Sequence, residues 1–174
     1  MLRTSKAEIQ GKTYRLLYTC SAMFDVQDEY GADALNSIGD AGSRDSLAAC
    51  IGIFRILATE AETIRRQAGY DPGPMPDEID ERLLTPKDWA DMKDAIFRAA
   101  TYGYSQEIET GEEVDLILLE NQRKNKKPLF RAKFLNFALR LGMQPSEMYR
   151  LTPGQFSDII TLRNMETKRI NENS

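Results

Sequence analysis

The residues between 47 and 64 constrain the fold more than any other part of the chain. Apolar side chains recur there at intervals of three and four residues, as on one face of an α-helix of about five turns. Ile53 and Ile56 widen that face, so we expect the first half of this helix at the centre of a core. Ser43 or Asp45 is suited to cap its start. The apolar face consists of Leu47, Cys50, Ile51, Phe54, Leu57, Ala58, Ala61 and Ile64.

A short β-hairpin is predicted over residues 7–19, before the long helix. The run after Gly11-Lys12 is rich in strand-forming side chains, and Gly-Lys is suited to the turn. Side chains two positions apart share one face of a strand, so Tyr14, Leu16 and Tyr18 are expected on the same side.

Further helices are predicted on both sides of the long one. Ser21 is expected to cap a helix that Gly31 ends. Thr85-Pro86 predicts another start, because Thr is a good N-cap and Pro is favoured at the first helical position. The stripe expected to be buried on that helix contains Trp89, Met92, Ile96, Phe97 and Ala100, and Gly103 is expected to loosen its end.

The C-terminal third predicts a small set of helices. Residues 112–122 predict a helix with an apolar run at 116–119, and residues 129–141 are amphipathic. Pro145–Tyr149 favours a short helix. Thr152-Pro153 repeats the Thr-Pro start. Residues 166–174 are polar and expected to fray. The apolar face of the 129–141 segment contains Phe130, Phe134, Phe137, Ala138 and Leu141.

These elements predict a mainly α fold, with an N-terminal β-hairpin followed by a helical domain and then a small helical C-terminal module. The basic run 123–128 is interpreted as a linker between residues 1–122 and 129–174. The charge balance also changes sign near this linker. Residues 1–118 carry 12 Lys and Arg against 22 Asp and Glu, whereas residues 119–174 carry 11 against 5. Such asymmetry favours two modules with different partners.

Composition argues against catalysis. The chain has no histidine, which removes the usual proton-transfer group near neutral pH and the commonest zinc ligand. The nucleotide-binding and metalloprotease motifs are also missing. Cys20 and Cys50 lack the spacing of a metal or redox site and are interpreted as core thiols, although sequence leaves a disulfide open. We expect no enzyme activity, no cofactor and no metal.

Three charged features leave alternatives open. The acidic run 77–81 and the triplet Asp88, Asp91 and Asp94 suggest a cation site, but solvated surfaces are the better interpretation. The basic run 123–127 suggests nucleic-acid binding, against a solvated hinge or a surface for an acidic protein. Residues 141–149 resemble a helix-turn-helix corner, but the next helix offers few donors for base edges.

The sequence gives no sign of a membrane or secretory segment. The longest apolar stretch, residues 47–57, is interrupted and too short to span a bilayer, and residues 1–6 lack the apolar core of a signal peptide. We therefore expect the protein to remain in the cytoplasm where it is made.

Several short segments together match a known layout. They are Gly11-Lys12-Thr13-Tyr14-Arg15-Leu16, Asp28-Glu29-Tyr30-Gly31, Leu84-Thr85-Pro86-Lys87-Asp88-Trp89, Leu141-Gly142, Pro145-Ser146-Glu147, Tyr149 and Leu151-Thr152-Pro153-Gly154-Gln155-Phe156. The layout resembles that of tail assembly chaperones of tailed bacteriophages, with an N-terminal chaperone domain and a C-terminal extension domain. Gly154-Gln155 departs from the acidic residue that the family pattern has there.

The resemblance implies a specific role and specific partners. Such a chaperone coats the tape measure protein in the host bacterial cytoplasm, recruits tail tube subunits through its extension, and is absent from the mature virion. In many phages a programmed frameshift joins the extension. Self-association would suit a coating role. The partner-binding candidates are Tyr14, Leu16, Lys126, Lys127, Phe130, Leu151 and Phe156, although core is the safer interpretation of the apolar ones. The alternatives are a structural virion component, such as a head-tail connector, and a small nucleic-acid-binding regulator.

Overall fold

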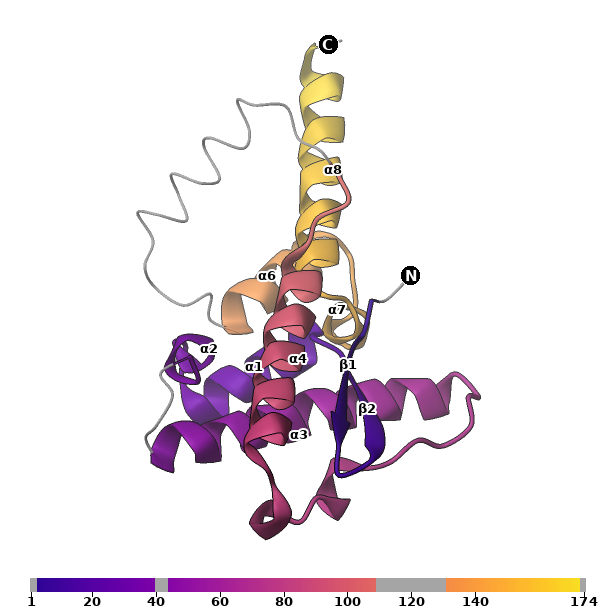
Figure 1. Ribbon diagram of the computed structural model, residues 1–174. Helices are drawn as coiled ribbons and strands as arrows, with labels where there is room; N and C mark the ends of the chain where they lie inside the picture. The colour runs from indigo at the N-terminus through magenta and orange to yellow at the C-terminus, as the bar shows by residue number, and fades with distance from the viewer. Residues whose placement is uncertain (1–2, 40–43, 109–130, 173–174) are drawn as a thin grey trace. The chain divides into compact units, whose positions relative to one another are not determined.

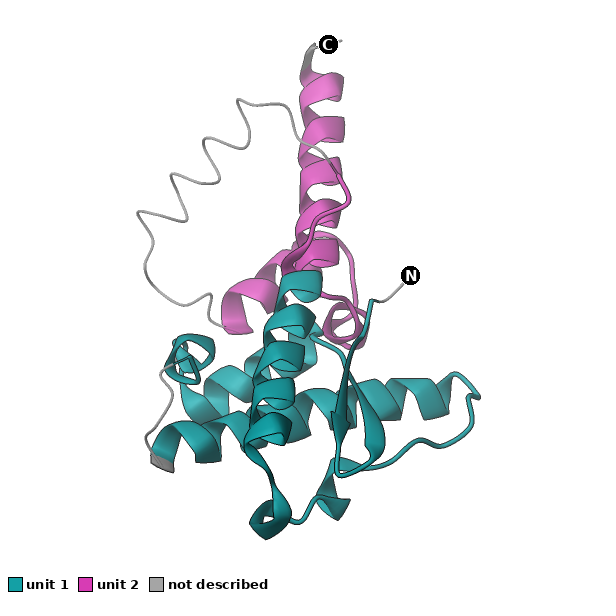
Figure 2. Cartoon of the chain, in the orientation of Figure 1, with its two compact units in different colours: residues 1–103 teal, residues 104–174 magenta. Residues whose placement is uncertain are grey.

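The computed structural model describes residues 3–39, 44–108 and 131–172 (Figure 1). The chain forms two compact units, residues 1–103 and 104–174, which Figure 2 colours separately. The predicted fold class is confirmed: the described chain is mainly helical, with an N-terminal two-stranded hairpin. The predicted linker at 123–128 and the predicted helix at 112–122 lie outside the described residues.

In its described residues, the first unit has a hairpin, four α-helices and two short 3-10 helices. In chain order these are β1 (Ser5–Ile9), β2 (Lys12–Leu16), α1 (Cys20–Tyr30), α2 (Ala34–Ser37), α3 (Arg44–Gln67), η1 (Pro76–Glu78), η2 (Glu81–Leu83) and α4 (Pro86–Tyr104), whose last residue begins the second unit.

The hairpin turns at Gln10-Gly11, not at Gly11-Lys12 as predicted. Both turn residues have positive φ, 50° and 72°, which a two-residue hairpin loop of type I′ requires. Lys12 is therefore the first residue of β2 and pairs with Ile9 in the antiparallel register. The one-residue shift leaves Tyr14 and Leu16 on the buried face, as predicted.

Helix α3 is the centre of the first unit, and β2, α1 and η1 all pack against it (Figure 1). Most of its predicted apolar face is buried, and Cys50, Phe54 and Leu57 are fully buried. Leu47 and Ile64, near its two ends, are half-buried. The ring of Phe54 meets that of Tyr14 edge to face, with centroids 5.7 Å apart. Such an aromatic contact adds to the burial energy that holds the hairpin on the helix.

Helix α1 begins earlier than predicted and ends where predicted. Thr19, not Ser21, is the N-cap, because its side chain accepts a hydrogen bond from the Ala22 N–H at 3.1 Å. At the other end Gly31 has φ 86°, which an L side chain rarely adopts. Tyr30 lies against Gly52 of α3, where a methyl group would overlap the tyrosine hydroxyl.

Helix α4 begins where predicted, but its buried face differs from the predicted one. Met92, Ile96 and Ala100 are buried as expected, whereas Phe97 is 40% exposed. Gly103 is the penultimate residue of α4, which ends at Tyr104. An added Cβ at Gly103 would come within 2.8 Å of Tyr18.

The second unit contains α6 (Arg131–Arg140), α7 (Pro145–Arg150) and α8 (Pro153–Glu172). Phe134 of α6 stacks on Phe156 of α8, with ring centroids 5.2 Å apart and an interplanar angle of 21°. Phe137 is 43% exposed, so it does not join the buried face predicted for it. Helix α8 continues to Glu172, which corrects the expectation of a frayed end from residue 166.

Candidate interaction surfaces

The two candidates in the hairpin lie in the core of the first unit. Tyr14 is 2% exposed and Leu16 is fully buried. The chain just after β2 is also fixed, because the Leu17 N–H donates to the Leu57 carbonyl of α3 at 3.2 Å. In this conformation both side chains hold the hairpin to α3. The charged residues Lys6, Glu8 and Lys12 of the hairpin are exposed, whereas Ser5 is buried and donates to the Ala95 carbonyl of α4 at 2.6 Å.

The structure describes two of the five partner-binding candidates in the C-terminal part. Phe156 is 2% exposed and carries the stack with Phe134, whereas Leu151 is half-buried at the end of α7. Lys126, Lys127 and Phe130 lie outside the described residues.

Both predicted Thr-Pro helix starts form reciprocal caps. At the start of α4 the Asp88 N–H donates to Thr85 Oγ1 at 3.2 Å, and Asp88 Oδ2 accepts from the Thr85 N–H at 2.8 Å. At the start of α8 the Gln155 N–H donates to Thr152 Oγ1 at 3.2 Å, and Gln155 Oε1 accepts from the Thr152 N–H at 3.0 Å. Each satisfies two backbone donors that a helix start leaves open.

The geometry explains the departure at Gly154-Gln155. A glutamine amide oxygen closes the cap as a carboxylate would. Gly154 is required because a Cβ there would overlap the Ser105 carbonyl. Asp158, one turn later, accepts from the Glu107 N–H at 2.9 Å and from the Ile108 N–H at 3.4 Å. The start of α8 is therefore fastened to residues 104–108.

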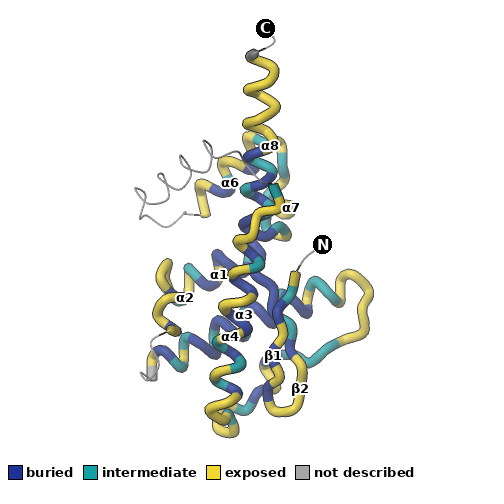
Figure 3. Tube along the Cα trace, turned by 45° about the horizontal axis from the view of Figure 1, so that its top comes forward, coloured by how far each residue is buried: buried dark blue, intermediate teal, exposed yellow. Residues whose placement is uncertain are grey.

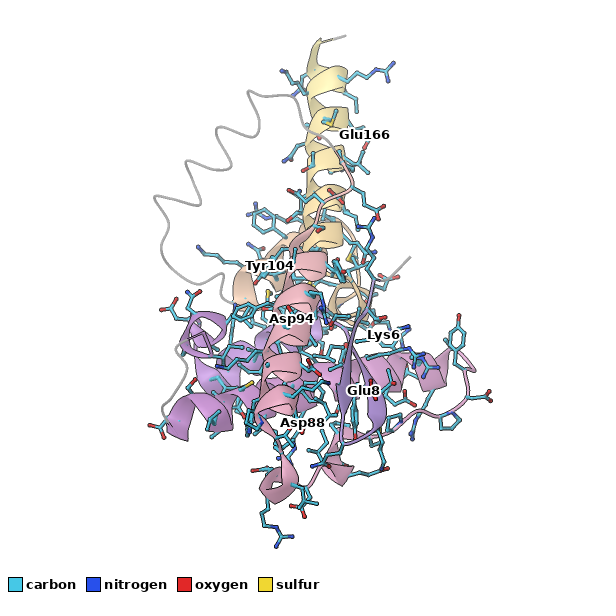
Figure 4. The ribbon with its side chains drawn as sticks, in the orientation of Figure 1. Lys6, Glu8, Asp88, Asp94, Tyr104 and Glu166 are labelled. Carbon is cyan, nitrogen blue, oxygen red and sulfur yellow. The ribbon has the colours of Figure 1, made fainter. Side chains whose placement is uncertain are left out.

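The acidic side chains considered as a cation site have other roles. Asp88 is a capping residue, and its hydrogen bonds with Thr85 hold its pKa below the usual value. Asp91 pairs with Lys87 at 2.8 Å, and Asp94 pairs with Arg98. Asp88 and Asp94 both lie on α4, as Figure 4 shows. No group of three or more potential metal ligands occurs among the described residues.

The acidic run 77–81 is likewise engaged in ion pairs. Glu78 pairs with Lys12 of β2, and Glu81 pairs with Arg55 of α3 at 2.8 Å. Asp80 caps η2 through the Arg82 N–H at 3.1 Å. These contacts tie the η1–η2 segment to the hairpin and to α3.

Both cysteines are free and fully buried. Burial raises the pKa of Cys20 to about 12 and that of Cys50 to about 11. Thiols with such pKa values remain protonated at neutral pH and are poor nucleophiles. They act as small apolar side chains, in agreement with the core role predicted for them.

Sequence reasoning missed the exposed apolar side chains of the second unit. Leu139 on α6 is 64% exposed, and Leu162, Met165 and Ile170 on α8 are each more than half exposed. The polar composition of residues 166–174 concealed the distal part of this set. The three-residue interval between Leu162 and Met165 has helical spacing, and no Gly or Pro follows it. This signal would have predicted that the helix continues past residue 166.

Among the described residues no helix is both long and apolar enough to cross a bilayer. Comparison of the chain with family models, with curated proteins and with solved structures finds no match.

Proposed function

We propose that this chain is a tail assembly chaperone of a tailed bacteriophage, which binds the tape measure protein and recruits tail tube subunits during tail assembly. The pair of Leu-Thr-Pro helix starts carries the proposal. One lies in each unit, and both are closed by the same reciprocal cap. Both also belong to the segments on which the resemblance to this family rests.

Exposed apolar side chains support a binding role over a catalytic one. Phe97 on α4 and Leu162 on α8 present apolar area on helices of different units. A chaperone that covers a long helical protein needs interfaces that form and release readily, and moderate apolar patches supply these. The protein would act in the host bacterial cytoplasm and be absent from the mature virion.

Co-expression tests the proposal. The phage's tape measure protein would be produced in bacteria with this chain, with an empty vector, or with an unrelated acidic helical protein of similar size. The proposal predicts that only this chain raises the soluble fraction of the tape measure protein and purifies with it through a tag on either partner. An unchanged soluble fraction together with no co-purification would reject it.

Two further measurements separate the alternatives. A structural virion component would be found in purified particles by quantitative mass spectrometry, whereas the chaperone would be found only in infected cells. A nucleic-acid regulator would shift DNA or RNA on a gel at physiological salt. That shift would be lost in Lys126→Glu plus Lys127→Glu, because phosphate contacts depend on cations.

A further inference from the structure

The two edges of the β-hairpin differ in what covers them. Helix α4 covers the edge of β1, where the Arg98 side chain donates to the Lys6 carbonyl at 3.0 Å. Along β2, no residue in the described part of the chain hydrogen-bonds to the backbone of Thr13 or Arg15 on the side away from β1. The outer edge of β2 is thus an open strand edge among the described residues.

The register of the hairpin determines where these backbone groups point. Ile9 and Lys12 close the two-residue loop and form a hydrogen-bonded pair. Such pairs alternate with non-hydrogen-bonded ones, so Thr13 and Arg15 belong to pairs of the second kind. Their N–H and C=O groups therefore point away from β1, just as the Lys6 carbonyl points away from β2. Only another extended chain can pair with all of them at once.

The strand β2 has little of the protection that open edges usually carry. Natural edge strands are often interrupted by Pro or a bulge, or carry an exposed Lys. β2 contains no Pro, and its register with β1 continues without a bulge. Its one lysine, Lys12, pairs with Glu78 of η1. The loop end of the hairpin, residues 10–13, is exposed (Figure 3). Burial of Tyr14 and Leu16 meanwhile fixes the strand on α3.

Charge on the outward face of the hairpin indicates the chemistry of an added strand. Lys6 and Arg15 lie directly opposite each other, and neither forms an ion pair within the described residues. Like charges in this position are destabilising, whereas opposite charges stabilise. Glu8, on the same face of β1, contributes after Asp91 to the raised pKa of Lys87, so it lies near the start of α4. A carboxylate beside Arg15 on an added strand would balance the cationic pair.

We infer that the outer edge of β2 binds an extended segment of another protein, which adds a third strand to the hairpin and places a carboxylate beside Arg15. The backbone groups of Thr13 and Arg15 give the affinity, and the Arg15 side chain gives the selectivity. A second copy fits less well. Its β2 has no acidic side chain, and the edge of its β1, which carries Glu8, is covered by α4. The inference does not depend on the phage partners named above.

An NMR titration of the isotope-labelled full chain tests this inference. The probes are two peptides of about eight residues with alternating Thr and Val, which differ at one central position, Glu in one and Lys in the other. The Glu peptide is expected to bind at least about threefold more tightly than the Lys peptide. Its binding is also expected to slow hydrogen exchange at the Thr13 and Arg15 N–H groups.

Three variants separate the backbone contribution from that of the side chains. Thr13→Pro removes one outward N–H without breaking the ladder to β1, and it should weaken binding of the Glu peptide by at least about tenfold. Thr13→Val keeps that N–H and is the matched control, with binding within about twofold of wild type. Arg15→Glu should reverse the preference, so that the Lys peptide binds more tightly. Circular dichroism should show unchanged helix content in each variant.

Several outcomes would overturn the inference. They are equal affinity of wild type for the two peptides, no binding of either, and full binding by Thr13→Pro. Binding that leaves hydrogen exchange at Thr13 and Arg15 unchanged would place the peptide elsewhere. Self-association of the chain that Thr13→Pro abolishes would assign the edge to a second copy.

Discussion

Glu62 is a buried carboxylate of the first unit with three hydrogen-bond donors. It is 5% exposed on α3 and accepts hydrogen bonds from Arg66 at 2.8 Å, Arg65 at 3.0 Å and the Gly73 N–H at 2.5 Å. Burial raises its pKa, but these three donors together outweigh that effect and leave the pKa below its usual value. The carboxylate thereby fastens the proline-rich loop at residues 71–76 to the end of α3.

Replacing this carboxylate by Glu62→Gln should lower the free energy of unfolding by about 2–3 kcal/mol at pH 7. The loss is below that of a fully buried pair because the Arg66 side chain is 44% exposed. A depressed folded-state pKa gives stability that is present above the unfolded value, about 4.3, and is lost as the pH falls through the folded value. The difference between the two proteins should therefore shrink toward pH 2, as measured by urea denaturation.

The exposed Glu8→Gln on β1 is the control and should change the free energy of unfolding by less than about 0.5 kcal/mol. A difference between wild type and Glu62→Gln that stays constant from pH 7 to pH 2 would contradict this role for Glu62.

Gly52→Ala provides a second test at the residue scale, because two effects oppose each other there. Helix propensity alone favours Ala by about 1 kcal/mol. The Tyr30 hydroxyl occupies the space of the new methyl group, so the substitution should destabilise the protein by about 1–3 kcal/mol. In a Tyr30→Ala background the space is free and the same change should become neutral or stabilising. Thermal or urea denaturation of wild type, Gly52→Ala, Tyr30→Ala and the double variant measures the coupling between the two positions.

At the scale of elements, the two reciprocal caps should each contribute about 1 kcal/mol. Thr85→Ala and Thr152→Ala are expected to lower the free energy of unfolding by that amount, measured by urea denaturation. Thr167→Ala is the matched control, because the Thr167 hydroxyl only bonds back to the Arg163 carbonyl within exposed α8. It should be neutral or slightly stabilising. Equal losses in all three variants would contradict the capping roles.

Gln155→Glu tests the same cap from its other side. A glutamate keeps the acceptor for the Thr152 N–H and adds negative charge near the positive end of α8. We expect a gain of about 0.3–1 kcal/mol that declines at high salt, as measured by urea denaturation in both conditions. A loss of stability would mean that the glutamine amide donates a hydrogen bond that the carboxylate cannot replace.

Elements with a strong local signal could be predicted from the sequence. The period of α3 and the Thr-Pro starts are properties of neighbouring residues, so their positions follow from local rules. The hairpin turn was predicted one residue too late. A two-residue turn containing Gly11 can include either Gln10 or Lys12, and only the register of the two strands decides between them. The distal half of α8 was missed because polar composition there outweighed a weak apolar period.

The candidate surfaces depended on tertiary contacts and were harder to predict. Tyr14 and Phe156 are large and apolar, and only packing against Phe54 and Phe134 shows that they are core. Phe97 and Phe137 show the reverse, because each has the spacing of a buried face and is 40% or more exposed. Local spacing gives the width of an apolar face but does not determine how much of it a neighbour covers.

At the scale of the whole molecule, the two units differ in charge. Residues 1–103 carry 12 basic against 17 acidic side chains, whereas residues 104–174 carry 11 against 10. The positive excess of the second unit lies in residues 131–172, with 7 basic against 4 acidic side chains. Opposite charge balances favour partners of different chemistry, and they steer the encounter with each partner differently. A protein that holds one component and passes it to another would benefit from this separation.

A reconstituted handover tests the proposed function most directly. The tape measure protein would be purified in complex with this chain, and tail tube protein would then be added while size-exclusion chromatography and native mass spectrometry follow all three components. We predict that tube subunits join the tape measure protein and that this chain is released in proportion. A chain that remains in the assembled tube, or a tape measure protein that forms no complex with it, would contradict the proposed function.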